Sequence, residues 1–421
     1  MMKLLKQIFH NNKKIIENFS YLSLMQMVIL LFPFMTYPYL LRVLGFNIYG
    51  TIIFAQTIAI NIAIIINFGF NISGTKDIAC NRENLSELSK IVSSIFSIKM
   101  ILWLGCLIIY FILIYFVPFL RKDWLLYVIS FFLTFNELLF PSWFFQGIEK
   151  MKYITFINIG VRLLFVIAIF VFVKDKTDFL IVPILNALGA LLSGLIALYV
   201  VFVKEKIRFI RQPYLTLRYF FIDSFPLFIS SLSVQVYVNI NKILVGAFLG
   251  MTDVAIYDLG EKITHIIKIP IRMISQATFP KISREKNIAF VNKVMFITVS
   301  LISFLYMFLY FNSERIVLLL SGEENIQAVQ ILRILSFSAI ISCFNLFLGG
   351  NRLVPFGYKK LYVKNAILNV LFFISGFIFL WVFSLINIYS LSYLYLMSEI
   401  FVFALNFYKC HTINLLLPIR K

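Results

Sequence analysis

Long apolar segments, each about the length that crosses the hydrocarbon of a bilayer, recur from one end of the chain to the other. Short connections with charged and turn-forming residues separate them. Strict alternation of apolar and polar positions, which is typical of transmembrane strands, is missing, so the pattern predicts helices. We expect about twelve spans, at residues 18–42, 48–69, 91–117, 124–145, 153–173, 179–203, 219–249, 253–280, 290–311, 328–349, 361–383 and 388–408.

The composition supports this all-α integral membrane class. Hydrophobic residues make up 61% of the chain and charged residues only 14%, whereas about a quarter of the residues in soluble domains are charged. The four cysteines are far apart and lack any zinc-binding spacing, so we expect free thiols. Neither a phosphate-binding glycine loop nor a catalytic cluster or metal-ligand set stands out. We therefore expect no enzyme, no cofactor and no metal.

The distribution of positive charge predicts the orientation. If the amino terminus is cytoplasmic, about 25 Lys and Arg residues fall in cytoplasmic segments and about 6 on the opposite side. Both termini are then expected in the cytoplasm. Topology accounts for much of the net charge of +19, and no nucleic-acid partner is needed to explain it.

A weak internal repeat divides the chain. Leu44-Gly45 in the first half and Leu249-Gly250 in the second each precede a tyrosine by a few residues. Their offset is close to half the chain, which is typical of transporters built from two repeats. We predict two six-helix bundles, at residues 1–210 and 211–421.

The eighth span is unusual because it is rich in charge. At about 100° per residue, its ionisable side chains fall within an arc of about 120°. They are Asp258, Glu261, Lys262, His265, Lys268 and Arg272. A charge at the centre of a spanning helix costs about 2.5–3.5 kcal/mol, so such side chains usually face a cavity or a partner. We predict a mostly cationic face toward an aqueous cavity.

Two other interpretations of this segment remain open. It could lie on the membrane surface as an amphipathic helix. Alternatively, its charges could neutralise one another through pairs that involve Asp258, Glu261 and Lys262.

Several polar side chains in other spans are further candidates for the cavity. In the seventh span Gln235, Asn239 and Lys242 follow one another at helical spacing, beyond a bend expected at Pro226. Lys99 could instead extend to the cytoplasmic surface. The predicted ligands of an anionic substrate are Lys262, His265, Lys268, Arg272, Lys242, Arg162 and Lys99. The candidates for binding a coupling ion are Glu137, Asp258, Glu261 and Glu399.

Three segments resemble one known family. Pro141–Tyr153, with the sequence PSWFFQGIEKMKY, resembles the signature at the end of the fourth helix in the bacterial polysaccharide transporter family, the Wzx-type O-antigen flippases. Tyr39–Gly50 and Phe68–Ala79 are similar to other parts of the same family. The motif residues are Trp143, Gln146, Gly147, Glu149, Arg42 and Gly45. The first four are expected at a cytoplasmic helix end, where packing or capping is the alternative to a direct functional role.

The resemblance implies the fold of the multidrug/oligosaccharidyl-lipid/polysaccharide exporter superfamily, with two six-helix bundles forming a V around a central cavity. It also implies flipping of an undecaprenyl-pyrophosphate-linked oligosaccharide from the cytoplasmic to the periplasmic leaflet of the inner membrane. Expected partners are membrane lipids, a coupling H⁺ or Na⁺, and other O-antigen assembly proteins such as a polymerase and a chain-length regulator. The alternatives are a drug or organic-cation antiporter of the same superfamily, which needs an acidic cavity, and an integral-membrane O-antigen polymerase. A polymerase is expected to have a large outward loop, but the longest expected here is residues 312–327.

The predicted topology can be tested with single cysteines in a cysteine-free background. An impermeant thiol reagent applied to intact cells should label cysteines at positions 123, 178 and 387, which lie on the expected outer side. Cysteines at positions 84, 212 and 359 should stay unlabelled until the membrane is opened. Labelling of the second set in intact cells contradicts the twelve-span topology.

Overall fold

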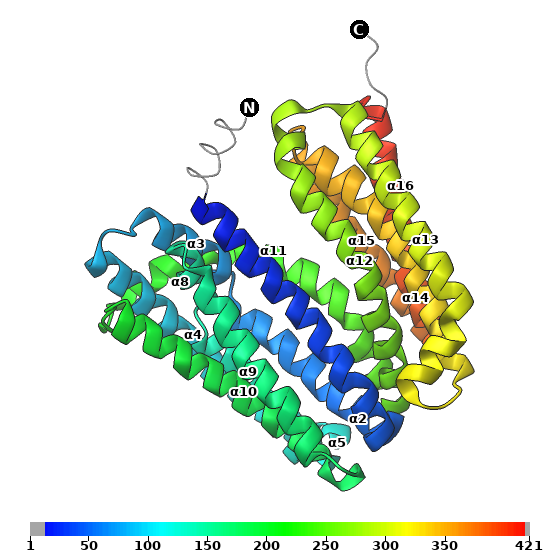
Figure 1. Cartoon of the computed structure of the whole chain (residues 1–421), viewed down its shortest axis with the longest axis horizontal. Helices are drawn as coiled ribbons and strands as arrows, with labels where there is room; N and C mark the ends of the chain where they lie inside the picture. Colours follow the sequence, from blue (N-terminus) through cyan, green and yellow to red (C-terminus); the bar gives the residue numbers. More distant parts are fainter. Residues whose placement is uncertain (1–12, 417–421) are drawn as a thin grey trace. The chain divides into compact units, whose positions relative to one another are not determined.

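The computed structural model describes residues 13–416, except for the side chains of residues 13–31, 33–34, 230, 233–239 and 280. Within this range the chain consists of helices and short connections, without a strand (Figure 1). The longer helices are α2 (Lys13–Asn67), α3 (Phe70–Cys80), α4 (Leu85–Phe116), α9 (Met151–Phe172), α10 (Ile181–Tyr199), α11 (Tyr214–Phe248), α12 (Met251–Glu285), α13 (Ile288–Ser321), α14 (Ile326–Asn345), α15 (Lys359–Val382) and α16 (Ile388–Thr412). The shorter ones are α5 (Pro118–Lys122), α6 (Trp124–Phe131), η1 (Phe132–Thr134), α7 (Phe135–Leu139), α8 (Ser142–Gly147), η2 (Lys176–Leu180), η3 (Val200–Lys204) and η4 (Leu346–Leu353).

The all-helical membrane class is confirmed. Within the described part of the chain, nine helical segments are long and apolar enough to cross a membrane. Neither α11 nor α12 is among them, and α12 carries the charged residues discussed above. The chain is a multi-pass membrane protein, and the number of twelve spans stays a prediction. The four cysteines are free thiols, as expected.

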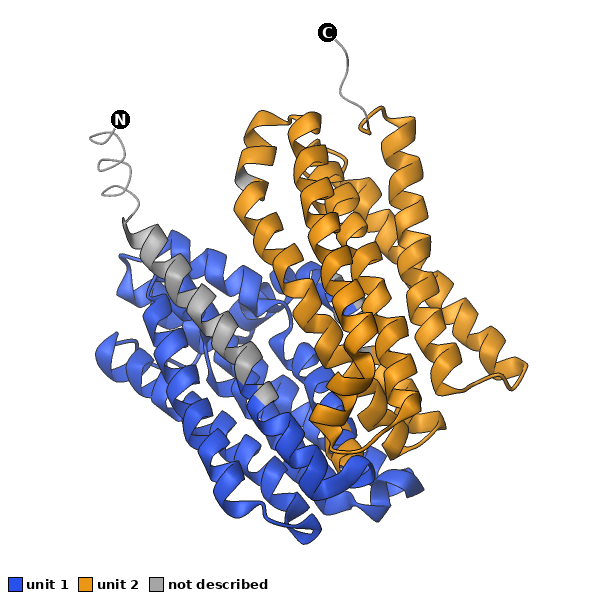
Figure 2. Cartoon of the chain, turned by 45° about the vertical axis from the view of Figure 1, so that its right-hand side comes forward, with its two compact units in different colours: residues 1–48, 54–236 blue, residues 49–53, 237–421 orange. Residues whose placement is uncertain are grey.

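The chain folds into two compact units (Figure 2). Unit 1 comprises Met1–Ile48 and Phe54–Val236, and unit 2 comprises Tyr49–Ile53 and Tyr237–Lys421. The division falls inside α11, whereas the sequence placed the start of the second bundle at residue 211. A short piece of α2 therefore belongs to the second unit.

Unit 2 is built around α14, which packs against α12, α13 and α16. Figure 1 shows these helices running side by side. A glycine permits the close approach of α12 to α14, because a Cβ at Gly260 of α12 would lie 3.1 Å from the Leu335 side chain. Ile263, Ile267 and Ile271 follow Gly260 at helical spacing and are buried. This apolar side of α12 leaves its charged side for other contacts.

Glycines break the backbone at the repeated Leu-Gly pairs. Gly45 has φ 76° and ψ 165°, which splits α2 into the two spans that the sequence predicts there. Gly250 precedes α12 with φ 135°. Both glycines adopt positive φ values, which residues with a Cβ rarely tolerate. The two Leu-Gly pairs thus mark corresponding helix junctions in the two halves of the sequence.

In unit 1, two of the family-like segments pack against each other where α3 meets α8. The Trp143 indole is buried, with 1% of its surface exposed. A Cβ at Gly74 would lie 3.0 Å from the Trp143 ring, and a Cβ at Gly147 would lie 2.5 Å from the Ile78 side chain. The two glycines are therefore needed because the helices approach so closely.

Charged and backbone groups cap the end of α8. Glu149 has φ 58°, and its Oε1 forms an ion pair with Arg82 Nη1 at 2.8 Å. Arg82 Nε donates to the Gly147 carbonyl at 2.6 Å, and the Gln146 carbonyl accepts from the Glu149 amide. These contacts match the packing and capping interpretation of the motif.

Two helix boundaries differ from the sequence prediction. Residues 70–80 lie between two predicted spans and form a further helix, α3, which starts after Gly69 at φ 80°. The ninth span continues past residue 311 to Ser321 and ends at Gly322, where φ is 81°. Its polar residues stay helical because Arg333 of α14 contacts Ser313 and Glu314. The expected outward segment at 312–327 is therefore much shorter than predicted.

Truncating the buried indole should destabilise unit 1. We expect Trp143→Ala to cost about 3–5 kcal/mol, because it leaves a cavity in a packed core. Trp124→Ala is the matched control, since that indole is 54% exposed. Thermal unfolding of the purified variants measures the difference. Equal losses in both variants contradict a packing role for Trp143.

Candidate functional site

The charged residues of α12 cluster around Asp258. Its carboxylate is 1% exposed and accepts from two ammonium groups. Lys242 Nζ of α11 lies 3.0 Å from Oδ1, and Lys262 Nζ lies 2.6 Å from Oδ2. One buried anion thus holds two cations from adjacent helices.

Glu261 supplies a second carboxylate to the same lysine. Its Oε2 lies 2.6 Å from Lys242 Nζ. Its Oε1 lies 3.9 Å from His265 Nε2, so the histidine completes an ion pair only when it is protonated. We call Lys242, Asp258, Glu261, Lys262 and His265 the α12 charge cluster. With a neutral histidine, its two lysines balance its two carboxylates.

A tyrosine from α2 joins this cluster. Lys262 Nζ donates to Tyr49 Oη at 2.6 Å and lies 5.3 Å from the centre of the ring. Tyr49 Oη also lies 3.4 Å from Asp258 Oδ2. The sequence drew attention to Tyr49 only through the internal repeat. Its contact with Lys262 could not be predicted from local spacing, because the two residues are more than two hundred positions apart.

Farther along α12, Lys268 has a different environment. Its Nζ donates to Tyr395 Oη of α16 at 3.0 Å, and Tyr395 Oη donates to Glu399 Oε1 at 3.3 Å. Asn345 Nδ2 donates to the other oxygen of Glu399 at 2.8 Å. Lys268 thus contacts a carboxylate only through a hydroxyl, and no acidic oxygen of the described chain lies within ion-pair distance of it.

Arg272 follows Lys268 one helical turn later and is exposed. Its guanidinium forms no ion pair with any carboxylate of the described residues. The cations on this face of α12, together with Lys242 of α11, are therefore of two kinds. Lys242 and Lys262 are paired with carboxylates, while Lys268 and Arg272 retain donors for a further anion.

The remaining predicted site residues lie in unit 1. Lys99 is 1% exposed, and its Nζ donates to the Glu137 carbonyl at 2.9 Å and lies 3.8 Å from Glu137 Oε2. Asn67 Nδ2 donates to both carboxylate oxygens of Glu137 at 3.1 and 3.0 Å. Lys99 therefore does not extend to the surface. Arg162 is exposed on α9 and is not part of this group.

Other predicted residues are separate from these groups. Trp143, Gly147 and Glu149 serve the contacts at α8 described above, and Arg42 is exposed on α2. The side chains of Gln235 and Asn239 lie outside the described residues.

The fold has close counterparts among membrane transporters. An inward-facing MATE-family multidrug resistance transporter of the MOP superfamily matches with a TM-score of 0.68 at 14% identity, over 91% of this chain and 95% of that chain. An outward-facing MATE-family transporter of the same superfamily matches with a TM-score of 0.58 at 13% identity, over 96% and 95%. The chain has the fold of these multi-pass transporters.

Sequence comparison then gives the family. The model of the polysaccharide biosynthesis protein family matches residues 15–286, and the chain belongs to this family. An Escherichia coli (strain K12) protein named "Putative O-antigen transporter" is 28% identical over 367 residues, which cover 85% of this chain and 88% of that protein. A Shigella dysenteriae protein of the same name is 27% identical over 270 residues, covering 63% and 66%. Both relatives and both structural counterparts are thus named as transporters.

The shared buried anion should produce strong coupling between Asp258 and Lys262. Asp258→Ala leaves two partly buried ammonium groups with one carboxylate, and we expect a loss of up to about 3 kcal/mol. Adding Lys262→Ala should recover part of that loss, because it removes the excess charge. Thermal unfolding of the two single variants and the double variant measures the coupling.

The control is Glu314→Ala, which breaks a surface ion pair with Arg333 in which the glutamate side chain is 77% exposed. There we expect about 0–1 kcal/mol. Additive losses at Asp258 and Lys262 contradict the paired arrangement.

Proposed function

We propose that this chain flips undecaprenyl-pyrophosphate-linked O-antigen repeat units from the cytoplasmic to the periplasmic leaflet of the bacterial inner membrane. Family membership and the names of the two relatives support a polysaccharide substrate. The predicted orientation, with both termini in the cytoplasm, supports the direction. Other O-antigen assembly proteins, including a polymerase and a chain-length regulator, are the proposed partners.

The observation that carries this proposal is the pair of cations at Lys268 and Arg272. Both lie on one face of α12, one turn apart, and neither has a carboxylate partner in the described chain. Ammonium and guanidinium groups make charge-assisted hydrogen bonds to phosphate oxygens, and guanidinium can do so through two parallel bonds. A pyrophosphate supplies the negative charge and the hydrogen-bond acceptors that complement these two cationic donors. His265, one turn before Lys268, is the next candidate ligand.

The paired lysines suggest how transport is coupled to an ion. An incoming phosphate competes with Asp258 and Glu261 for Lys242 and Lys262, because all are oxygen anions. A carboxylate released in an apolar environment is most simply neutralised by a proton. The α12 charge cluster would then exchange an internal anion for the substrate and take up H⁺, with Na⁺ as the alternative. Glu137 and Glu399, each hydrogen-bonded to an asparagine, remain further candidates for this role.

The rival antiporter has less support from these contacts. An organic cation needs a carboxylate that is free to receive it, whereas Asp258 and Glu261 already hold ammonium groups.

In unit 1, Lys99 and Arg162 stay proposed anion ligands, although the contact of Lys99 with Glu137 leaves Arg162 the more accessible of the two.

Loss of either cation should abolish most transport without unfolding the protein. We expect Lys268→Ala and Arg272→Ala to reduce surface display of completed O-antigen sharply at normal membrane levels of the protein. Lys268→Arg should retain much of the display because the charge is kept, and Lys268→Glu should abolish it by repelling the anion. Immunoblots of O-antigen and of the transporter measure both quantities.

Lys281→Ala is the matched control, since Lys281 is exposed on the same helix and lies 4.0 Å from Glu285. It should leave display unchanged. Full display in both Lys268→Ala and Arg272→Ala excludes this pair as the substrate site.

A further inference from the structure

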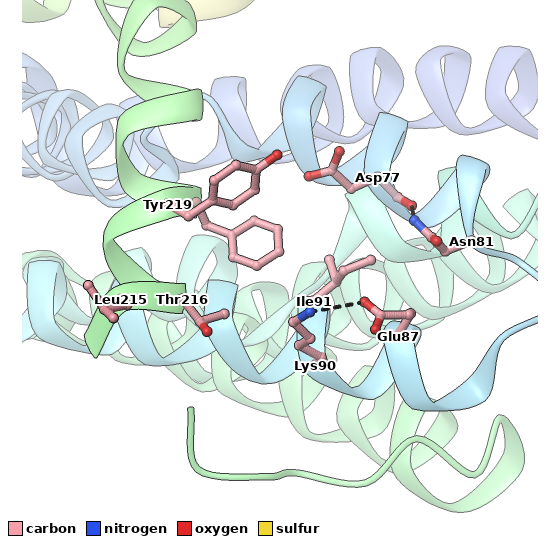
Figure 3. Close-up of a pocket in the computed structure, with 9 residues that line it drawn as sticks. Asp77, Asn81, Glu87, Lys90, Ile91, Leu215, Thr216 and Tyr219 are labelled. Atoms are coloured by element: carbon pink, nitrogen blue, oxygen red, sulfur yellow. Dashed lines mark hydrogen bonds and ion pairs between the residues drawn. The ribbon is translucent and has the colours of Figure 1, made fainter. Parts of the chain in front are cut away.

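A pocket of about 500 Å³ opens in unit 1, away from the α12 charge cluster in sequence and in chemistry. It lies between the end of α3, the start of α4 and the start of α11 (Figure 3). The volume is within the range of about 300–1,000 Å³ of small-molecule sites. None of the roles described so far uses it.

The lining combines hydrogen-bonding side chains with an exposed aromatic ring. Asp77 and Asn81 come from the α3 side, Glu87 and Lys90 from α4, and Tyr219 from α11. Figure 3 shows Asp77 and Tyr219 pointing toward one another from opposite walls. Tyr219 is 66% exposed, whereas its neighbour in the sequence, Phe220, is buried.

Several of these polar groups have capacity for a ligand. The carboxylate of Asp77 forms no hydrogen bond or ion pair with the described chain. Asn81 uses only its Nδ2, which donates to the Asp77 backbone carbonyl at 2.8 Å. Glu87 and Lys90 contact each other at 3.3 Å, and both side chains are more than 40% exposed. Acceptors and donors are therefore available side by side.

Contacts about one to two and a half turns deeper hold the walls of the pocket in place. Ser73 Oγ of α3 and Ser224 Oγ of α11 lie 2.8 Å apart. Phe68 stacks on Phe228 with ring centres 4.7 Å apart. A Cβ at Gly69 would lie 2.8 Å from the Phe228 amide nitrogen, so this approach of the backbones requires glycine. The pocket is preformed between fixed helices.

The charge of the lining argues against a phosphate. Two carboxylates, Asp77 and Glu87, face one ammonium group, Lys90, so the pocket is acidic overall and repels anions. A neutral ligand with many hydroxyl groups suits it better. Hydroxyls both donate to carboxylates and accept from Lys90 and Tyr219, while the C–H face of a sugar ring can lie on an aromatic ring.

We infer that this pocket binds a sugar residue of the transported glycan, with Tyr219 as the stacking platform and Asp77 as a hydroxyl acceptor. The inference rests on the proposed function, since it assigns the glycan part of the same substrate. In the predicted topology this end of unit 1 faces the cytoplasm, where the substrate starts. The acidic pocket would select the glycan, whereas the cationic residues of α12 would hold the pyrophosphate.

Binding of the free glycan to the purified transporter tests this assignment. The probe is the repeat-unit oligosaccharide released from the O-antigen of the source bacterium, without lipid or pyrophosphate, and calorimetry or saturation-transfer NMR measures its Kd. We expect Tyr219→Ala to weaken binding about tenfold, because it removes the aromatic contact. Asp77→Asn should weaken it as well, and Tyr219→Phe should retain most of it.

Tyr214→Ala is the matched control, because Tyr214 lies on the same helix, is 75% exposed and is not part of the lining. Inorganic pyrophosphate is the second probe. Its binding should be unchanged in Tyr219→Ala and lost in Lys268→Ala, while glycan binding shows the reverse pattern.

The two probes separate the two proposals. Glycan binding that is unchanged in both Tyr219→Ala and Asp77→Asn, or absent in the wild type, overturns the pocket assignment. Pyrophosphate binding that survives Lys268→Ala and Arg272→Ala instead contradicts the proposed substrate site on α12 and leaves the pocket assignment standing.

Discussion

An ionised side chain inside an apolar helical unit needs an opposite charge or a set of hydrogen bonds, because leaving it alone costs several kcal/mol. This constraint explains the contacts of α12. Asp258, almost completely buried, holds Lys242 and Lys262 at once, and Glu261 provides the second negative charge that balances them. The same rule operates in unit 1, where the buried Lys99 ammonium lies against Glu137.

These pairs neutralise most of the charge of the α12 charge cluster. Lys268 and Arg272, which have no carboxylate partner among the described residues, are therefore the cations available to bind an anion. Lys268 donates to the Tyr395 hydroxyl and forms no ion pair with a carboxylate of the described residues, and Arg272 is exposed on the same face. The proposed substrate combines an anionic pyrophosphate with a sugar chain, and these two parts need different partners. Lys268 and Arg272, near the middle of α12, suit the first part, and the acidic pocket lined by Asp77 and Tyr219 suits the second.

The sequence predicted features that depend on neighbours along one helix. Helical spacing placed the charges of α12 on one face, and the Leu44-Gly45 pair marked a real break in α2. It could not predict Tyr49 or Tyr395 as partners, because those contacts arise only when distant helices pack together. Polar residues at 312–315 indicated a loop, yet Arg333 on a neighbouring helix satisfies two of them and α13 continues to Gly322. The sequence also could not show whether the charges of α12 pair with one another or face a cavity, because that depends on distances between side chains in the folded protein.

The most direct test of the account is transport by the purified protein in liposomes, with a labelled undecaprenyl-pyrophosphate-linked repeat unit and, in parallel, a cationic dye. The account predicts that the glycan becomes accessible on the opposite leaflet only when the protein is present, at a rate that responds to an imposed proton or sodium gradient. Gradient-driven movement of the dye with no movement of the glycan contradicts it.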